Sequence, residues 1–290
     1  MRKLKLLPES AIESYDRIVA VKHHGRRELL QGLRASVLEK YEVYRQAAPH
    51  LGTLTRGSFS KEESEALHHC YEVATEPLDV LKNAIRKNQE RPWQSICAYC
   101  GINNPRTVEH YVPRSEHPEY AVCLYNLLPA CDECNNNKGT NWRDLGTGER
   151  KQFHFYYDPI PEEVRWLVAR IEVLGDTPRA VFSLELPKVL APSLSRLIQE
   201  HYHSLKLLER YEGSANGVLS ELLTNVNGFP IEREPLRGEL NRTARGLAKL
   251  YGENFWKVAV YRGAAASDAF LDMVCKANAE SLLSALPGAA

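Results

Sequence analysis

The sequence predicts an α+β protein that is mainly helical, with a small cysteine-containing module and a short β-hairpin region embedded in it. Three observations predict this class. Apolar residues recur at helical spacing near both ends of the chain, two C-x-x-C pairs lie close together near its middle, and two β-branched runs flank a turn further on. Separate helical and strand-forming stretches of this kind are typical of α+β folds.

Composition and charge narrow the class of protein. A chain of 290 residues with 43% apolar content can bury a large core. The 37 basic and 37 acidic residues balance, which argues against a protein that coats nucleic acid by charge alone. The basic start MRKLKL is not followed by an apolar signal segment, and no apolar run reaches about 18 residues. We therefore expect a cytoplasmic protein with no contact to a membrane.

The first 90 residues are predicted to be helical. Apolar spacing favours helix over residues 9–48, and Ser10 is placed to cap its start. After a Gly- and Thr-containing break, Ser60 and Glu63 have the spacing of a capping box. Pro77 is expected to divide the following stretch into two helices, because proline interrupts a helix interior.

The second half is predicted to begin with strands and to end with helices. The aromatic run FHFYYD at 153–158 has strand-like composition, and the segments 164–175 and 179–186 flank Asp176-Thr177-Pro178 as a hairpin would. Helical patterns follow from Ser193 onward; the candidate helices are residues 195–212, 232–252 and 254–286. The expected organisation is an N-terminal helical region (1–90), a zinc-containing module (91–150), and a β segment followed by a C-terminal helical region (151–290).

The cysteines predict a structural zinc site. Cys97-x-x-Cys100 and Cys131-x-x-Cys134 form two pairs, and two such turns supply the four thiolates of a tetrahedral zinc site with no position open to water. Four ordinary buried cysteines and a redox pair are the alternatives. The total of seven cysteines is odd, which is typical of a reducing compartment rather than of a disulfide framework.

Polar residues between and after the cysteines predict hydrolytic chemistry. Glu109 offers a carboxylate for Mg²⁺, and His110 offers an imidazole that can deprotonate water near pH 7. Asn135 adds a carbonyl oxygen, and Lys138 or Arg114 could hold a phosphate oxygen. The alternative for His110 is a structural histidine. His117 has no motif around it and is expected to lie in a surface loop.

The order and spacing of these residues resemble the HNH (ββα-metal) endonuclease family, in the subgroup with four zinc-binding cysteines. The shared pattern consists of C-x-x-C, an acidic-His pair followed by an apolar residue and Pro, Asn-Leu, and C-x-x-C-N-x-x-K, here Cys97/Cys100, Glu109 to Pro113, Asn126-Leu127, and Cys131 to Lys138. The resemblance implies that His110 is the general base, that Glu109 and Asn135 bind a catalytic metal, and that Asn126 braces the histidine-bearing loop. The sequence departs from the family by having glutamate before the histidine, where aspartate is usual, and Asn135 in place of the final histidine.

Two functions are considered. The first is a metal-dependent HNH endonuclease that cleaves phosphodiester bonds, most readily in DNA, with structural Zn²⁺ and catalytic Mg²⁺ or Mn²⁺. The alternative is a non-catalytic zinc module that binds nucleic acid or protein.

A looser resemblance links the chain to HNH effectors of prokaryotic antiphage (antiviral) defence that pair with an ATPase. The sequence contains no Walker A motif, so an ATPase would be a separate partner. One nuclease site per chain also favours a homo-oligomer for cutting both strands. The sequence does not distinguish DNA from RNA as the substrate.

Overall fold

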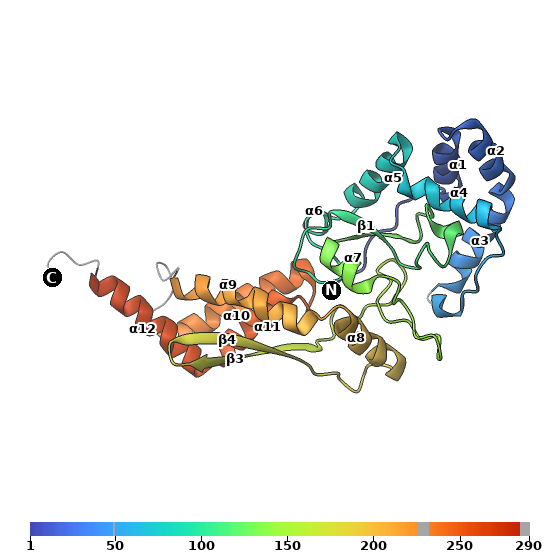
Figure 1. Cartoon of the computed structure of the whole chain (residues 1–290). Helices are drawn as coiled ribbons and strands as arrows, with labels where there is room; N and C mark the ends of the chain where they lie inside the picture. Colours follow the sequence, from blue (N-terminus) through green and yellow to red (C-terminus); the bar gives the residue numbers. More distant parts are fainter. Residues whose placement is uncertain (49, 225–231, 285–290) are drawn as a thin grey trace. The chain divides into compact units, whose positions relative to one another are not determined.

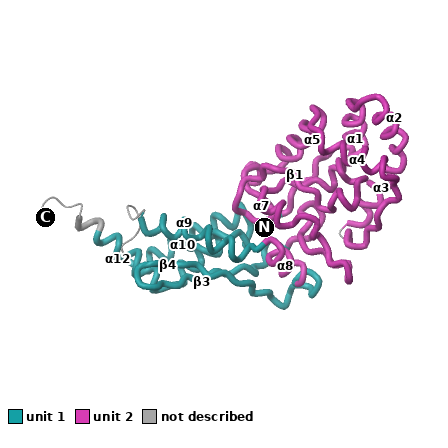
Figure 2. The backbone as a smooth tube through the Cα atoms, viewed as in Figure 1, with its two compact units in different colours: residues 1–2, 161–195, 206–290 teal, residues 3–160, 196–205 magenta. Residues whose placement is uncertain are grey.

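The computed structural model describes residues 1–48, 50–224 and 232–284, and it confirms the α+β class (Figure 1). Helices make up 54% of the chain, and the strands of the described part form two antiparallel two-stranded sheets. The chain divides into two compact units, coloured separately in Figure 2. We call residues 3–160 with 196–205 the cysteine unit, and residues 1–2, 161–195 and 206–290 the hairpin unit. The division of the sequence at residues 90 and 150 stays a prediction.

The cysteine unit contains most of the short elements. Its helices are α1 (Ala11–Ala20), α2 (His24–Gly32), α3 (Arg34–Ala47), α4 (Lys61–Glu72), α5 (Glu76–Lys87), α6 (Arg91–Gln94) and α7 (Asp132–Lys138), together with most of α8 (Pro192–Ser204). Its single-turn 3₁₀ helices are η1 (Leu51–Thr53) and η2 (Pro118–Tyr120), and its strands are β1 (Thr107–His110) and β2 (Leu127–Ala130).

Local sequence signals explain where several of these helices begin. The hydroxyl of Ser10 accepts a hydrogen bond from the Glu13 N–H and caps α1. Ser60 and Glu63 form the predicted capping box at the start of α4. Pro77 lies in the first turn of α5, where its missing N–H has no helical partner to lose. The stretch 9–48 is helical as predicted, and it consists of the three helices α1 to α3.

The N-terminal helices surround the small β1–β2 sheet. Antiparallel pairing places His110 opposite Leu127 and Glu109 opposite Leu128. Helix α5 packs on β2, α7 packs on β1, and α3 and α4 both contact η2. Strand β2 is buried along its whole length, and the helices packed on the two strands come from before the sheet (α5) and after it (α7) in the sequence.

The predicted strand at 153–158 is wrong. This segment forms a turn, in which the Asp158 carboxylate accepts the N–H of His154 and the Asp158 N–H donates to the His154 carbonyl. Phe153, Phe155 and Tyr156 are buried. The aromatic composition that suggested a strand therefore reflects packing in the core, which aromatic residues also favour outside strands.

The hairpin unit is built on β3 (Leu167–Leu174) and β4 (Thr177–Leu184). The predicted hairpin is confirmed, but its turn is Gly175-Asp176, because Thr177 already pairs with Leu174. Gly175 has φ +62, which only glycine adopts without cost at such a turn. The unit's long helices are α9 (Leu207–Thr224), α10 (Arg233–Tyr251), α11 (Trp256–Ala266) and α12 (Asp268–Ser284).

Close backbone contacts hold the hairpin against its helices. Helix α9 packs on β4 and α11 packs on β3. Gly263 of α11 lies against the carbonyl of Ala169, where a side chain would collide with the strand. The predicted helix at 254–286 is divided at Ser267, and its last two residues lie outside the described part of the chain. Among the described helices, none combines the length and the apolar character needed to cross a bilayer.

Candidate metal centre and nuclease site

The two C-x-x-C pairs come together as one buried cluster. The Sγ atoms of Cys97, Cys100, Cys131 and Cys134 lie within 4.8 Å of one another. The Sγ atoms of Cys100 and Cys131 are 3.8 Å apart. Four sulfurs at the corners of a tetrahedron, each about 2.3 Å from a central zinc, are separated by about 3.8 Å. The cluster therefore has the ligand type, number and dimensions of a structural zinc site.

Tight turns aim the four sulfurs inward. Gly101 has φ +69 and donates its N–H to the Cys97 carbonyl at 2.7 Å, which closes the first turn. Cys131 caps α7, and its Sγ accepts the Cys134 N–H at 3.4 Å. The Cys131 N–H in turn donates to the Sγ of Cys97 at 3.3 Å. Hydrogen bonds from the neighbouring thiols lower the pKa of Cys131, whereas burial raises the pKa of Cys97 and thiol hydrogen bonds raise that of Cys134.

The imidazole of His110 is held at the end of β1 in one orientation. Its Nε2 donates to the carbonyl of Ala121 at 2.8 Å, so Nδ1 carries the lone pair. Among the described residues, Nδ1 has no hydrogen-bond partner. The ring of Tyr71 from α4 packs edge-on against it with centroids 4.2 Å apart. Burial lowers the pKa of His110 to about 3, so the ring is neutral near pH 7, the state that a general base requires.

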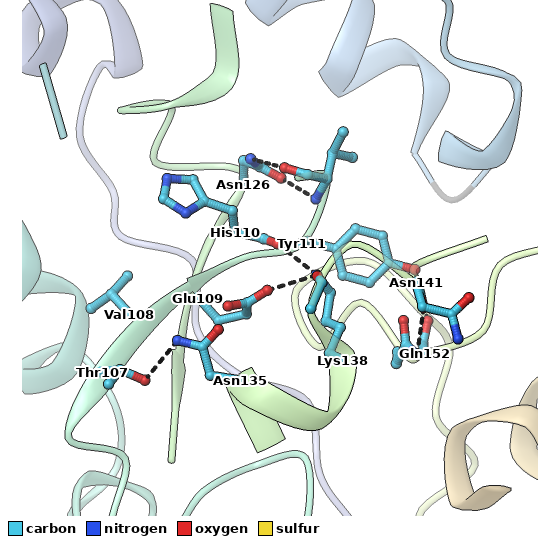
Figure 3. Close-up of polar contacts among 12 residues, drawn as sticks. Thr107, Val108, Glu109, His110, Tyr111, Asn126, Asn135, Lys138, Asn141 and Gln152 are labelled. Atoms are coloured by element: carbon cyan, nitrogen blue, oxygen red, sulfur yellow. Dashed lines mark hydrogen bonds and ion pairs between the residues drawn. The ribbon is translucent and has the colours of Figure 1, made fainter. Parts of the chain in front are cut away.

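Glu109 and Lys138 form a buried ion pair beside this histidine (Figure 3). The Lys138 ammonium is 2.6 Å from Oε1 of Glu109 and 2.8 Å from the carbonyl of His110. The Lys138 side chain is 1% exposed and that of Glu109 is 8% exposed. Burial raises the pKa of Glu109 and lowers that of Lys138, while their mutual attraction opposes both shifts. The lysine thus faces protein oxygens, an arrangement different from the phosphate contact expected for it.

Asn126 connects the loop after β1 to the start of β2. Its Oδ1 accepts the Val112 N–H at 2.7 Å and the Tyr44 hydroxyl at 3.0 Å. Its Nδ2 donates to the carbonyls of Val112 and Tyr120. Asn126 is fully buried, so all these bonds are shielded from water. They hold the loop that follows His110, and Tyr44 extends the network to α3.

Asn135 is half-buried on the side of α7 that faces β1. Its Nδ2 is 3.4 Å from the Thr107 hydroxyl, which leaves its carbonyl oxygen for another partner. In Figure 3 the side chains of Glu109 and His110 leave β1 in different directions, yet both line one cleft together with Asn135. The cleft has a volume of about 610 Å³. Carboxylate and amide oxygens that line a cleft of this size suit a hard divalent ion that keeps several waters.

The lining of this cleft is strongly basic. Four cations reach it, Lys82, Arg86, Arg106 and Arg114, against one carboxylate, Glu109, which is already paired with Lys138. Lys82 and Arg86 belong to α5, outside the cysteine-containing segment. Sequence reasoning missed them and Tyr71, although their i and i+4 positions on an amphipathic helix place both cations on one face.

His117 is a further departure from expectation. The predicted surface-loop position is wrong, because His117 is fully buried and its Nδ1 lies 3.3 Å from the equally buried Glu119 carboxylate. Its ring stacks on Tyr120 of η2. His117 therefore packs the loop behind Asn126 and does not line the cleft.

The fold and site define a class: a ββα module in which two short strands and a helix carry a zinc-type cysteine cluster, a neutral histidine and hard oxygen ligands beside a basic cleft. Residues 97–141 match the HNH endonuclease family. The chain therefore contains an HNH endonuclease domain, as its sequence pattern indicates.

Two curated proteins are similar over part of the chain. Protein ea31 of Escherichia phage lambda is 30% identical over 137 residues, which are 46% of this chain and 45% of that protein. The Septu protein PtuB of Bacillus thuringiensis is 38% identical over 50 residues, which are 16% of this chain and 20% of PtuB. Each match spans less than half of the relative. No solved structure matches the chain.

Proposed function

We propose that this protein is a metal-dependent endonuclease that hydrolyses phosphodiester bonds, with DNA as its substrate. The observation that carries the proposal is the state of His110. Its Nε2 is engaged by the Ala121 carbonyl, and its Nδ1 is left without a partner among the described residues, at the edge of a basic cleft. A neutral, oriented imidazole beside a phosphate-binding surface has the properties of a general base for hydrolysis.

Each residue of the site has its own role in the proposed reaction. Nδ1 of His110 accepts a proton from water as the water oxygen bonds to phosphorus and the bond to the 3′ oxygen breaks. Glu109 and Asn135 supply the oxygens that would hold Mg²⁺ or Mn²⁺. Such an ion, when bound, stabilises negative charge on the phosphate and on the leaving oxygen. Lys138 keeps the Glu109 carboxylate and the His110 carbonyl in place through its buried contacts.

The test is cleavage of supercoiled plasmid by the purified chain with Mg²⁺ or Mn²⁺. His110→Ala should abolish nicking while the zinc content stays near one ion per chain. His24→Ala is the matched control, because the side chain of His24 is 81% exposed on α2. Cleavage retained by His110→Ala would refute the assigned base. Binding without metal-dependent cleavage in the unaltered chain would favour the alternative zinc module.

We further propose that the nuclease serves prokaryotic antiphage defence with an ATPase partner. The similarity to the Septu protein PtuB supports this context, as does the looser resemblance found in the sequence. The hairpin unit, which lies outside the matched HNH segment, offers helices α9 to α12 for docking. We expect the isolated chain to cleave slowly and a partner ATPase to accelerate it. Rapid cleavage by the isolated chain would remove the reason for proposing a partner.

A further inference from the structure

The cleft contains cations that the proposed chemistry does not use. Lys82, Arg86 and Arg106 all line it, and among the described residues no carboxylate lies within ion-pair distance of any of the three. The Nε of Arg86 is buried and lacks a hydrogen-bond partner among the described residues. Buried donors are nearly always satisfied in native proteins. Three cations with no carboxylate beside them give the cleft a positive charge that suits an anion.

The ring of Tyr71 places Lys82 and Arg114 near the proposed general base. The Lys82 ammonium lies 4.1 Å from its centroid, and the Arg114 guanidinium lies 5.4 Å from it. The His110 ring contacts the same centroid at 4.2 Å, so the ammonium lies within about 8 Å of the imidazole centre. The Tyr71 hydroxyl donates to the Val108 carbonyl at 2.6 Å, which fixes the ring against β1.

Positive charge is crowded at this point. Burial lowers the pKa of Lys82, Asp79 opposes the shift, and Arg86 and Arg114 lower it further. Arg114 alone among the four cleft cations has an acidic partner, Glu72 at 3.1 Å, and that carboxylate is 53% exposed. Like charges held close together repel one another, and a bound anion removes the repulsion.

We propose that Lys82, which lies over the Tyr71 ring, and Arg86, one turn further along α5, form a second phosphate-binding subsite that holds a backbone phosphate of the nucleic acid next to the one being cleaved. This inference rests on the proposed nuclease function and deepens it. The helical region that precedes the HNH domain then binds substrate directly. It also gives a chain of zero net charge a local site for a polyanion, since four of its 37 basic residues line one cleft.

The experiment measures binding without cleavage. The full chain carrying His110→Ala is titrated into a short fluorescein-labelled DNA duplex between about 50 and 200 mM salt, and the slope of log K against log salt is determined. Each phosphate contact contributes about 0.9 to this slope. Adding Lys82→Gln and Arg86→Gln should reduce the slope by about 0.9, the contribution of the one phosphate held there, and weaken binding at every salt concentration.

A charge-matched control separates the subsite from general electrostatics. Lys87→Gln with Arg91→Gln also removes two cations from the same part of the chain, but both residues are exposed and neither lines the cleft. The control should keep the unaltered slope. An unchanged slope in the α5 variant, an equal loss in the control, or no measurable binding of duplex or single-stranded DNA would overturn the subsite. Plasmid cleavage by His110→Ala would instead overturn the proposed base and leave the slope comparison valid.

Discussion

Replacing Lys138 by methionine tests the buried ion pair most directly. Methionine retains most of the side-chain volume but removes the ammonium, which lies 2.6 Å from Glu109 and 2.8 Å from the His110 carbonyl. The Glu109 carboxylate then stays buried without a counter-charge. Removing one partner of a buried pair costs about 3–5 kcal/mol, and this range includes the lost bond to the His110 carbonyl. We expect Lys138→Met to destabilise the chain by that amount.

The assay is urea unfolding of the full chain in EDTA-free buffer, with the zinc content measured before each titration. Lys151→Met is the control, because the Lys151 ammonium donates to Asn141 in an exposed hydrogen bond and its loss should change stability by less than about 0.5 kcal/mol. The double variant Lys138→Met with Glu109→Gln should recover part of the loss, since no charge is left buried. A cost below about 1 kcal/mol for Lys138→Met would show that the pair is not buried as described.

Three further predictions concern the cysteine cluster, the hydrogen bonds of Asn126 and the buried His201. Cys131→Ser should reduce bound zinc well below one ion per chain by elemental analysis, whereas Cys275→Ser, which lies outside the cluster, should not change it. Asn126→Ala should cost about 2–3 kcal/mol in urea unfolding, because it leaves several buried partners unsatisfied. His201 has a pKa lowered to about 3 by burial, so only the unfolded chain takes up its proton as the pH falls below about 6.5. Its contribution to the free energy of unfolding should fall by about 2 kcal/mol between pH 7 and pH 5. His201→Gln should remove this part of the pH dependence. The same pH dependence in the variant and in the unaltered chain would contradict the lowered pKa of His201.

The sequence predicted structure correctly where the residues that determine it are neighbours in the chain. Ser10 and the Ser60–Glu63 box act within one helical turn, and Pro77 acts on its own turn, so their effects could be predicted from neighbouring residues alone. The C-x-x-C pairs are also local turns, and tetrahedral coordination requires them to converge. The zinc-type cluster could thus be predicted before any tertiary arrangement was known.

Features that depend on distant packing could not be predicted in this way. The run 153–158 has the composition of a strand, but burial of its aromatic rings and the Asp158 carboxylate turn it back on itself. Tyr71 touches His110 because α4 packs beside β1, and no spacing in the sequence reports that contact. The cations of α5 are recognisable as one face of a helix, but which surface that face meets is decided by the fold.

The contacts of Tyr44, Tyr71 and His201 have a consequence for how such a domain can be moved between proteins. Tyr44 from α3 holds Asn126, Tyr71 from α4 holds β1, and His201 from α8 holds the Tyr99 carbonyl within the first cysteine turn. A fragment cut to the family match at 97–141 would lack all three. The smallest segment that can be grafted onto another protein, or inherited as a working part, is therefore expected to be residues 3–160 together with the end of α8. The motif at 97–141 contains the residues of the proposed chemistry, whereas the segment expected to work as a transferable unit is several times longer.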